Sequence, residues 1–268
     1  MKVSIVTISF NQAQFLEAAI NSVLNQDYDN LEYIVVDPGS TDGSREILEK
    51  YSSKITTLIL EPDMGPADGL NKGFCIANGE IYGFLNSDDV FLPNAIKEAV
   101  GYFKAYPDVD MVSGHCFTID ENGSRLRRAY SDRVSLLAYA FNACVQVQPS
   151  TFFRAAAYTK AGGFNKDNRV CWDGELFIDI TLNGGKSKIV KNFWSEYRLH
   201  SESITCTPKM DRARKQELIR IFKKITGRNE RASDMFFKLV YRLYKHMANP
   251  FALYERITKG PFVTKKQK

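Results

Sequence analysis

Short apolar runs alternate with amphipathic helical segments along the first 90 residues, and this alternation restricts the fold more than any other feature. The apolar runs are rich in β-branched residues, and the segments between them carry apolar residues at helical spacing. Strands that alternate with helices at this pitch form a parallel, helix-covered sheet, so the sequence predicts an α/β fold. The strand-like runs are 2–9, 32–37, 55–60 and 81–85, and the helical segments are 15–24, 44–51 and 67–77.

The fourth apolar run, Ile81–Leu85, ends abruptly in Asn86, Ser87, Asp88 and Asp89. In an open α/β sheet, ligands bind beyond the carboxyl ends of the strands. Adjacent carboxylates repel each other, and a hard cation such as Mg²⁺ or Mn²⁺ compensates that repulsion well. This stretch therefore predicts a metal site, with a solvated turn or a helix cap as the alternative.

Small polar residues also follow the first two strands. Ser9, Phe10 and Asn11 come after the first strand, and Asp37 ends the second. A carboxylate at that position can accept hydrogen bonds from a base or a ribose, or it can cap its own turn. The chain has neither the Gly-x-Gly-x-x-Gly dinucleotide fingerprint nor the Gly-rich phosphate loop that ends in Lys-Ser/Thr. We expect these neighbouring strand ends to share one ligand.

Composition indicates an ordinary globular protein. A chain of 268 residues with 44% hydrophobic residues can hold one large domain, or a domain plus an appendage. We expect no secretory signal and no membrane span, because no uncharged apolar stretch reaches roughly 18 residues. The five scattered cysteines form no Cys-x-x-Cys pair, which predicts reduced and mostly buried thiols in a cytoplasmic protein.

Charge divides the chain into two parts. Residues 208–268 contain 17 basic and 5 acidic residues, a net charge of +12, whereas 1–207 carry a net charge of −7. Apolar stripes with aromatic and basic neighbours suit an anionic membrane interface, and packing on the body or on a second copy of the chain is the alternative. We expect no nucleic-acid partner, because no reader motif is recognised and the body is acidic. The last residues, 262–268, are predicted to be loose. The two stripes are Leu218, Ile221, Phe222 and Ile225, and then Phe236, Val240, Leu243 and Met247.

Three segments resemble family 2 glycosyltransferases of the GT-A fold. Val3–Asn11, Ile34–Gly43 and Leu85–Asp89 match in order and spacing, and Glu61–Gly73 fits the segment between the last two. The resemblance implies a Rossmann-like, mostly parallel sheet with helices on both faces. It implies a nucleotide-diphospho-sugar transferase domain over 1–207. A basic, amphipathic, helical C-terminal region follows over 208–268.

The resemblance also assigns roles to individual residues. It places the metal on Asp89 and Asp88, with His200 on a loop over the diphosphate, and it assigns Asp37 to the uracil of a UDP-sugar. This chain departs from the family pattern at Ile8, Pro38 and Asn86. The residues implied to contact the nucleotide are Ser9, Phe10, Asn11, Asp37, Asn71 and Asp88.

The general base is implied by the segment Cys171–Asp179. By position it is Asp173, with Glu175 as the second choice, and Asp179 stands where the family usually has arginine. A sugar hydroxyl is a poor nucleophile until a base removes its proton, and a positioned carboxylate accelerates that step by about 10²–10⁴-fold. The resemblance also implies that the predicted strand 148–154 runs beneath the donor sugar. The remaining residues implied to contact donor or acceptor are Gln148, Ser150, Trp172 and Arg198.

The implied activity is inverting, metal-dependent transfer of a sugar from a nucleotide-diphosphate donor, most simply a UDP-sugar. The acceptor would be a hydroxyl of a glycan or of a lipid-linked molecule, in the synthesis of cell-surface polysaccharide or lipopolysaccharide. The implied location is the cytoplasm, or the inner face of the cytoplasmic membrane. Two alternatives are a sugar-nucleotide-binding protein without catalysis and a nucleotidyltransferase. The latter would need a Gly-rich basic loop after the first strand, which Ser9–Gln12 is not.

Overall fold

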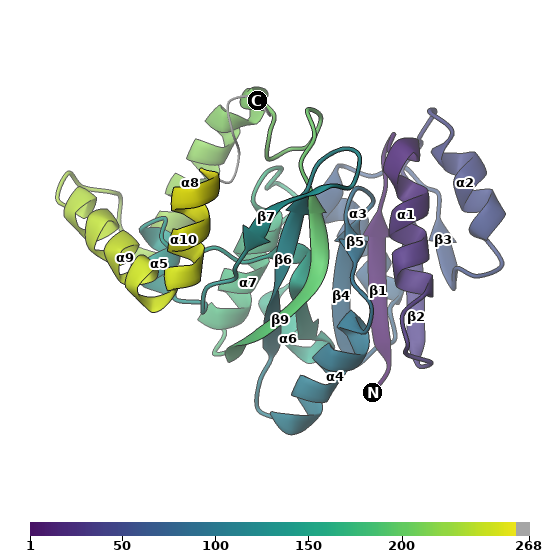
Figure 1. Ribbon diagram of the computed structural model, residues 1–268, viewed down its shortest axis with the longest axis horizontal. Helices are drawn as coiled ribbons and strands as arrows, with labels where there is room; N and C mark the ends of the chain where they lie inside the picture. The colour runs from purple at the N-terminus through teal and green to yellow at the C-terminus, as the bar shows by residue number, and fades with distance from the viewer. Residues whose placement is uncertain (261–268) are drawn as a thin grey trace.

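The computed structural model describes residues 1–260 and shows one nine-stranded sheet with helices on both faces (Figure 1). The predicted loose tail, 262–268, lies outside the described residues. The strands are β1 Val3–Ile8, β2 Leu31–Val36, β3 Thr57–Ile59, β4 Ile81–Asn86, β5 Val90–Phe91, β6 Met111–Ile119, β7 Arg125–Ala129, β8 Thr151–Arg154 and β9 Ser187–Arg198. The helices are α1 Ala13–Leu24, α2 Ser44–Tyr51, α3 Pro66–Ile76, α4 Ala95–Ala105, α5 Leu136–Ala140, α6 Ala155–Ala161, α7 Trp172–Leu182, α8 Asp211–Thr226, α9 Asp234–Ala248 and α10 Pro250–Lys259, with 3₁₀ turns η1 Gln148–Ser150 and η2 Pro208–Met210.

The sheet is parallel in its first half and mixed beyond it. β1 lies between β2 and β4 and is parallel to both, and β3 extends the sheet next to β2. β8 then pairs antiparallel with β4 and with β6, and β9 runs parallel to β6. β7 and β5 add antiparallel edges to β6 and β9. The parallel half is the one that the alternation of strands and helices predicts.

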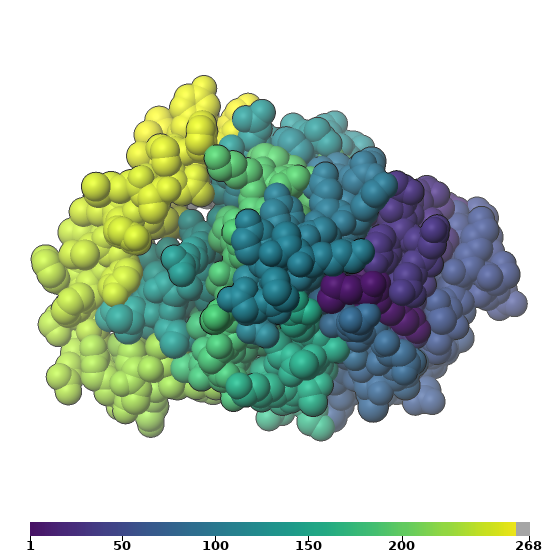
Figure 2. All heavy atoms as spheres, turned by 90° about the horizontal axis from the view of Figure 1, so that it is seen from below, coloured from purple at the N-terminus to yellow at the C-terminus, as the bar shows by residue number. Residues whose placement is uncertain are grey.

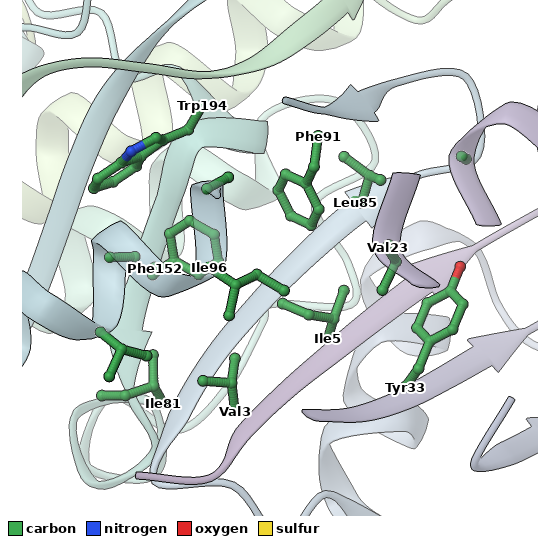
Figure 3. Packing of buried hydrophobic residues seen from close by; sticks show 14 of the residues in the cluster. Val3, Ile5, Val23, Tyr33, Ile81, Leu85, Phe91, Ile96, Phe152 and Trp194 are labelled. Atoms are coloured by element: carbon green, nitrogen blue, oxygen red, sulfur yellow. The ribbon is translucent and has the colours of Figure 1, made fainter. Parts of the chain in front are cut away.

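Each face of the sheet buries its own apolar core. Val3 and Ile5 of β1 point to one face, where α1, α2 and α4 cover them together with Phe152 and Trp194 (Figure 3). Val6 points to the other face, where α3, α6 and α7 pack. Successive residues of a strand alternate between the two faces, so a nearly continuous apolar strand serves both cores. The two cores fix the central strands and therefore the loops at their carboxyl ends.

The C-terminal helices α8, α9 and α10 gather at the end of the molecule opposite α2 (Figures 1 and 2). α8 packs against α5, and α10 packs against β7. In residues 1–260, none of the helices has the length and apolar character needed to span a lipid bilayer. The predicted C-terminal helical extension is therefore present, and its three helices differ in how they meet the body.

Two local predictions can be checked against this structure. The segment 148–154 was expected to be a strand throughout, but it opens with the 3₁₀ turn η1 and becomes a strand only at Thr151. A proline at position 149 explains this, because proline has no backbone N–H to give to a sheet. All five cysteines are free thiols, but only two of them are buried, so the prediction that most of them are buried is wrong.

Candidate active site

A cavity of about 780 Å³ opens at the carboxyl ends of β1 and β4. Loops from several elements form its walls, including the residues before α3, the start of α7 and the segment after β9. This is the edge at which open α/β sheets bind ligands, and the volume is typical of small-molecule sites. The lining residues are Ile8, Ser9, Phe10, Gln12, Pro38, Asp63, Met64, Gly65, Pro66, Asn86, Ser87, Asp88, Gln148, Arg169, Val170, Trp172, Asp173, Tyr197, Glu202, Ser203, Ile204 and Thr205.

Buried polar atoms without a hydrogen-bond partner concentrate at this cavity. Eight such side-chain atoms occur among the described residues. Three of them belong to the lining residues Ser9, Asn86 and Trp172, and a fourth is Oδ2 of Asp89, which follows the lining residue Asp88. A buried polar atom left unpaired is costly, so such atoms are rare in folded proteins. Their concentration here indicates that the cavity binds a polar ligand.

The loop after β1 supplies an aromatic ring to this cavity. Ser9 and Phe10 both line it, and the Phe10 side chain is 58% exposed. Asn11 has a positive φ of 52°, and its Oδ1 accepts a hydrogen bond of 2.9 Å from the backbone N–H of Thr41. Asn11 therefore lies beside the main cavity and fastens the loop after β1 to the loop after β2.

Asp37 lies at the end of β2 but does not line the cavity. It is fully buried, and its Oδ1 accepts hydrogen bonds from the backbone N–H groups of Gly39 and Ser40. Arg45 Nε also lies 3.0 Å from that oxygen. Of the two roles considered for Asp37, the structure therefore shows the turn-capping one, and the neighbouring Pro38 faces the cavity.

The two adjacent carboxylates after β4 have different surroundings. Asp88 lines the cavity, and its Oδ2 lies 3.0 Å from Nε2 of His200. Asp89 is 1% exposed, and its Oδ1 accepts a hydrogen bond of 2.8 Å from the backbone N–H of Arg198. Burial, and then the charge of Asp88, raise the pKa of Asp89 well above its usual range. A positive charge at this place would favour the ionised form of Asp89.

The donor atoms here fit a hard divalent cation. Asp89 Oδ2 has no partner, and Asp88 offers a second carboxylate at the cavity. The described residues contain no group of three or more His, Cys, Asp or Glu side chains placed to hold a metal ion. Mg²⁺ does not require such a group, because it is commonly held by one or two carboxylates together with substrate phosphates. The site therefore fits a metal that arrives with a phosphorylated ligand.

Asp173 lines the cavity from the first turn of α7. Burial raises its pKa, although hydrogen bonds from the backbone N–H groups of Gly174 and of Asp173 itself act in the opposite direction. A carboxylate whose pKa is raised is a stronger base, and its pKa lies closer to the pH at which it must accept a proton. The structure thus places Asp173, the implied base, in the wall of the cavity.

Glu175 is only two residues further along α7 but faces away from the cavity. It is 1% exposed, and Arg220 and Lys224 of α8 both pair with its carboxylate. Burial acts to raise the pKa of Glu175, but hydrogen bonds from Arg220, Asn168 and Lys224 outweigh it and lower the pKa to about 2. A carboxylate so firmly held as an anion in ion pairs is a poor proton acceptor, so the geometry favours Asp173 over Glu175.

Of three other predicted residues, Ser150 and Arg198 are buried and Asn71 is half-buried. Ser150 is fully buried and donates a hydrogen bond to the carbonyl of His115. Asn71 holds Phe164 from both sides, donating to its carbonyl and accepting from its N–H at 2.8 and 2.9 Å. Arg198 is 6% exposed, and its guanidinium donates to backbone carbonyl groups. None of these three side chains lines the cavity, and each holds neighbouring backbone in place.

Gln148 and Trp172 do line the cavity, as the resemblance implies. Gln148 Nε2 donates to the carbonyl of Phe84, and its Oε1 accepts from Asn86. The Gln148 amide therefore joins the end of β4 to the turn before β8. The indole N–H of Trp172 has no partner and is available to a ligand.

Sequence reasoning missed several residues of the cavity wall. Arg169 is the one Lys or Arg that lines the cavity among the described residues, and no motif pointed to it. Asp63 and Glu202 lie inside segments that the resemblance covers, and their acidic side chains at loop positions were the available signal. Burial is the largest influence on Asp63 and raises its pKa. The cavity is therefore acidic, with a single guanidinium near Gly65.

Comparisons with known proteins agree with this site. The sequence model described as Glycosyl transferase family 2 matches residues 4–173, which include the loops after β1, β2 and β4 and end at Asp173. An uncharacterized glycosyltransferase of Nostoc sp. is 30% identical over 75% of this chain, and the matched region spans 65% of that protein. A Bacillus subtilis protein, named as a glycosyltransferase of teichuronic acid biosynthesis, is 35% identical over 37% of this chain and 41% of its own length.

Solved structures show the same fold. The structure of residues 1–349 of S. aureus TarS in complex with UDP-GlcNAc has a TM-score of 0.70 and 18% identity, over 98% of this chain and 77% of that one. A mannosyltransferase of Pyrobaculum calidifontis, in complex with GDP-Man and Mn²⁺, has a TM-score of 0.64 and 22% identity, over 96% and 73% of the two chains. At these identities the likeness shows the fold alone, and it confirms the predicted GT-A fold.

Proposed function

Because this chain belongs to glycosyl transferase family 2, we propose that it transfers a sugar from a UDP-sugar to a hydroxyl group of a glycan or lipid-linked acceptor. The family assignment identifies the chain as a glycosyltransferase. The nucleotide, the metal, the inversion of the anomeric carbon and the acceptor are the parts that we propose. The structure of a distant relative with UDP-GlcNAc supports the choice of UDP.

One observation carries this proposal. A single cavity receives Ser9 and Phe10 from the loop after β1, Asp88 from the end of β4 and Asp173 from the start of α7. To these residues the resemblance assigns the nucleotide (Ser9, Phe10), the ribose or metal (Asp88) and the proton of the acceptor hydroxyl (Asp173). Segments that lie more than 160 residues apart in the sequence converge there, which chance placement of scattered carboxylates would not produce.

Asp173 is proposed to act as the general base. It would accept the proton of the acceptor hydroxyl while that oxygen attacks the anomeric carbon. The bond from the anomeric carbon to the diphosphate breaks in the same step, and a single displacement inverts the configuration. The position of Asp173 in the wall, together with the rise of its pKa on burial, supports this role.

Asp88 and Asp89 are proposed to hold Mn²⁺ or Mg²⁺ together with oxygens of the diphosphate. When bound, such a cation neutralises the charge that develops on the leaving nucleoside diphosphate. The unpaired Oδ2 of Asp89 supports this assignment, and so does the distant relative that was solved with Mn²⁺. His200 would act here through its contact with Asp88.

We further propose that the acceptor lies at the inner face of the cytoplasmic membrane, which the chain contacts through α9 and α10. Their exposed apolar side chains lie among cations such as Arg242 and Arg256, and residues 208–268, to which both helices belong, carry a net charge of +12. An anionic lipid surface is the partner that matches both properties. We propose cell-surface polysaccharide synthesis as the process, and the Bacillus relative, whose name gives teichuronic acid biosynthesis, supports this choice. The exposed apolar side chains are Met235, Phe236, Phe237, Leu239, Val240, Leu243, Tyr244, Met247, Phe251, Tyr254 and Ile257.

Release of UDP tests the proposed chemistry. The full-length protein is incubated with a panel of UDP-sugars and Mn²⁺, with and without acceptor lipid extracts. Asp173→Asn keeps the size of the side chain but removes the base, so turnover should fall by about 10²-fold or more while UDP binding persists. Asp89→Ala should lose the part of UDP binding that depends on Mn²⁺. The thermal shift caused by UDP, with and without Mn²⁺, measures this loss.

Asp167→Asn is the matched control, because it makes the same chemical change in the same loop at an exposed position outside the cavity wall. Its turnover should equal that of the wild type. Normal turnover in Asp173→Asn would reassign the base. Binding of a UDP-sugar without any turnover would favour a binding protein, and release of diphosphate on incubation with a sugar phosphate and UTP would favour a nucleotidyltransferase.

A further inference from the structure

The buried carboxylate of Glu175 connects α7, which carries Asp173, to the C-terminal helix α8. Arg220 Nη1 donates to its Oε1 at 2.8 Å, Arg220 Nη2 donates to its Oε2, and Lys224 Nζ donates to Oε1 at 3.0 Å. Lys224 also lies 2.5 Å from Asp179 Oδ1, one turn further along α7. Two cations of α8 therefore face two carboxylates of α7. The resemblance implies an arginine at position 179, where this chain has an aspartate. The positive charge beside α7 comes instead from α8, which lies outside the residues 4–173 that the family model matches.

The same carboxylate also organises the loop that leads into α7. Asn168 Nδ2 donates to Glu175 Oε2 at 2.8 Å, and Asn168 is 1% exposed. Its Oδ1 in turn accepts from the backbone N–H groups of Val170 and Cys171, at 3.1 and 2.9 Å. This chain of contacts runs from α8 through Glu175 and Asn168 to the backbone just before Asp173.

The loop held by Glu175 and Asn168 forms one wall of the cavity. Arg169 and Val170 of the braced loop line it, and Trp172 and Asp173 follow directly. Cys171, at the N-cap position of α7, makes no side-chain capping hydrogen bond. The backbone groups at this end are instead held by Asn168, so the direction in which Asp173 enters the cavity depends on Glu175 and its partners.

α8 also reaches a second wall. Arg214 Nη2 donates at 2.9 Å to the carbonyl of Ile204, which lines the cavity in the segment after β9. Ile221 and Phe222 are both 1% exposed, and Phe222 packs against Phe141 at a ring distance of 5.8 Å. α8 is thus seated by an apolar face and contacts two walls of the cavity at once.

We propose that α8 is a brace for the active site, in which Arg220 and Lys224 are positioning residues that act on Asp173 through Glu175 and Asn168. The proposal rests on the proposed role of Asp173. A buried carboxylate whose cations are removed is left with an uncompensated charge, so the wall must rearrange when the brace is broken. A small displacement of a reacting group is enough to lower turnover substantially.

Two measurements on the full-length protein test the brace. The first is hydrogen–deuterium exchange of the backbone over 165–175, which needs no substrate. The second is kcat with the donor in excess, together with the affinity for UDP. Arg220→Gln and Glu175→Gln should each speed exchange over 165–175 and lower kcat by roughly 10- to 100-fold, with UDP affinity retained. The double variant should lose no more than either single one, because both remove the same contact.

Arg228→Gln is the matched control. Arg228 also makes a two-pronged ion pair, with Asp234, but it reaches neither α7 nor the cavity. Its exchange over 165–175 and its kcat should match the wild type. Arg220→Lys keeps the positive charge and loses the two-pronged contact. Its exchange over 165–175 and its kcat should lie between those of the wild type and of Arg220→Gln. This variant keeps the proposal testable even if Arg220→Gln folds poorly.

Unchanged exchange over 165–175 in Arg220→Gln would overturn the brace. Faster exchange with the kcat of the Arg228→Gln control would overturn the positioning role. If the wild type transfers no sugar, the proposed function fails, while the exchange measurement still decides whether α8 holds the wall.

Discussion

Helices α8 and α9 share a basic, amphipathic character but have opposite surroundings. Both are basic, and both carry apolar residues on one face. In α8 that face is core, with Ile221 and Phe222 each 1% exposed. In α9 the predicted stripe faces outward, since Phe236 is 65% exposed and Met247 is 82% exposed. The same kind of pattern has thus become an interior surface in one helix and an outer surface in the next.

The difference lies in what each helix finds opposite it. α8 meets complementary buried charge, because Glu175 and Asp179 of α7 face its cations. Among the described residues, α9 meets no such pair: it stacks Phe237 and Tyr241 on Phe141 at ring distances of 5.5 and 5.3 Å, and its Lys245 pairs with Asp132 at 2.9 Å. An amphipathic helix is stabilised by burying its apolar face, so α9 requires a partner for the exposed one.

Truncation should show the largest effect. A chain that ends at Thr207 loses α8, which leaves Glu175 buried without its cations at a cost of about 3–5 kcal/mol. It also loses the burial of Ile221 and Phe222, each about 1.5–3 kcal/mol. These losses are comparable with the whole stability of a domain, so we expect no cooperative thermal transition by circular dichroism.

A chain that ends at Asn229 keeps α8 and is the control for that truncation. It should melt cooperatively and should still bind UDP. If the chain that ends at Thr207 melts like the full-length protein, α8 does not contribute to the stability of the body.

A matched pair of phenylalanine substitutions measures how much apolar packing contributes to stability in each of the two helices. Phe222→Ala should lower the free energy of unfolding by about 3–5 kcal/mol, because it empties a packed position in α8. Phe236→Ala should change it by no more than about 0.5 kcal/mol, because that side chain is exposed. Urea unfolding measures both. Equal losses would show that α9 is packed as firmly as α8.

Acid should weaken the bond between α8 and the body. The pKa of Glu175 is about 2 in the folded chain, against 4.5 normally, because its ion pairs outweigh burial. A lowered folded pKa stabilises the protein above the unfolded pKa, and this contribution, roughly 3 kcal/mol, is lost as pH falls from about 5 towards 2. The stability difference between wild type and Arg220→Gln should therefore shrink over that window. A difference independent of pH would mean that the Glu175 ion pairs contribute nothing.

Sedimentation with liposomes tests whether the outward face of α9 and α10 binds a membrane. Each lysine or arginine near an anionic lipid surface should contribute about 1 kcal/mol of binding free energy. The full-length protein should sediment with anionic vesicles at low salt and not with neutral ones. Attraction should weaken in 1 M salt, where the Debye length is roughly 3 Å. Changing Phe236, Leu243 and Phe251 to serine should reduce binding.

The control for that variant changes Leu60, Ile76 and Leu182 to serine, which are exposed apolar residues of the body. It should bind anionic vesicles like the wild type. If the wild type ignores anionic vesicles and sediments as a dimer, the face covers a second copy of the chain instead.

Much of the fold and part of the site could be predicted from local pattern. The alternation of apolar runs and helical segments gave β1 to β4 and their parallel order, because burial on both faces requires nearly continuous apolar strands. The polar ends of β1 and β4 do meet at one cavity. The placement of Asp173 followed from resemblance, and its neighbour Trp172 also lines the cavity.

Other features depend on contacts between distant segments. The antiparallel direction of β8 was not visible, because an apolar run has no direction in its composition. Ser150 and Asn71 became anchors, because the groups that they hold come from segments 35 and 93 residues away. Arg214, Arg220 and Lys224 gave no signal of their own, since cations on an amphipathic helix usually face water.

By itself, the sequence determined the layered α/β architecture, the edge of the sheet at which the cavity opens and the excess of positive charge in the C-terminal region. These properties follow from local periodicity and composition. The tertiary structure alone decided which of two carboxylates on α7 faces the cavity, because residues two positions apart on a helix point about 200° apart and only packing fixes the rotation. It also decided that α8 joins the core while the apolar stripe of α9 faces outward, because α8, unlike α9, lies against the buried carboxylates of α7.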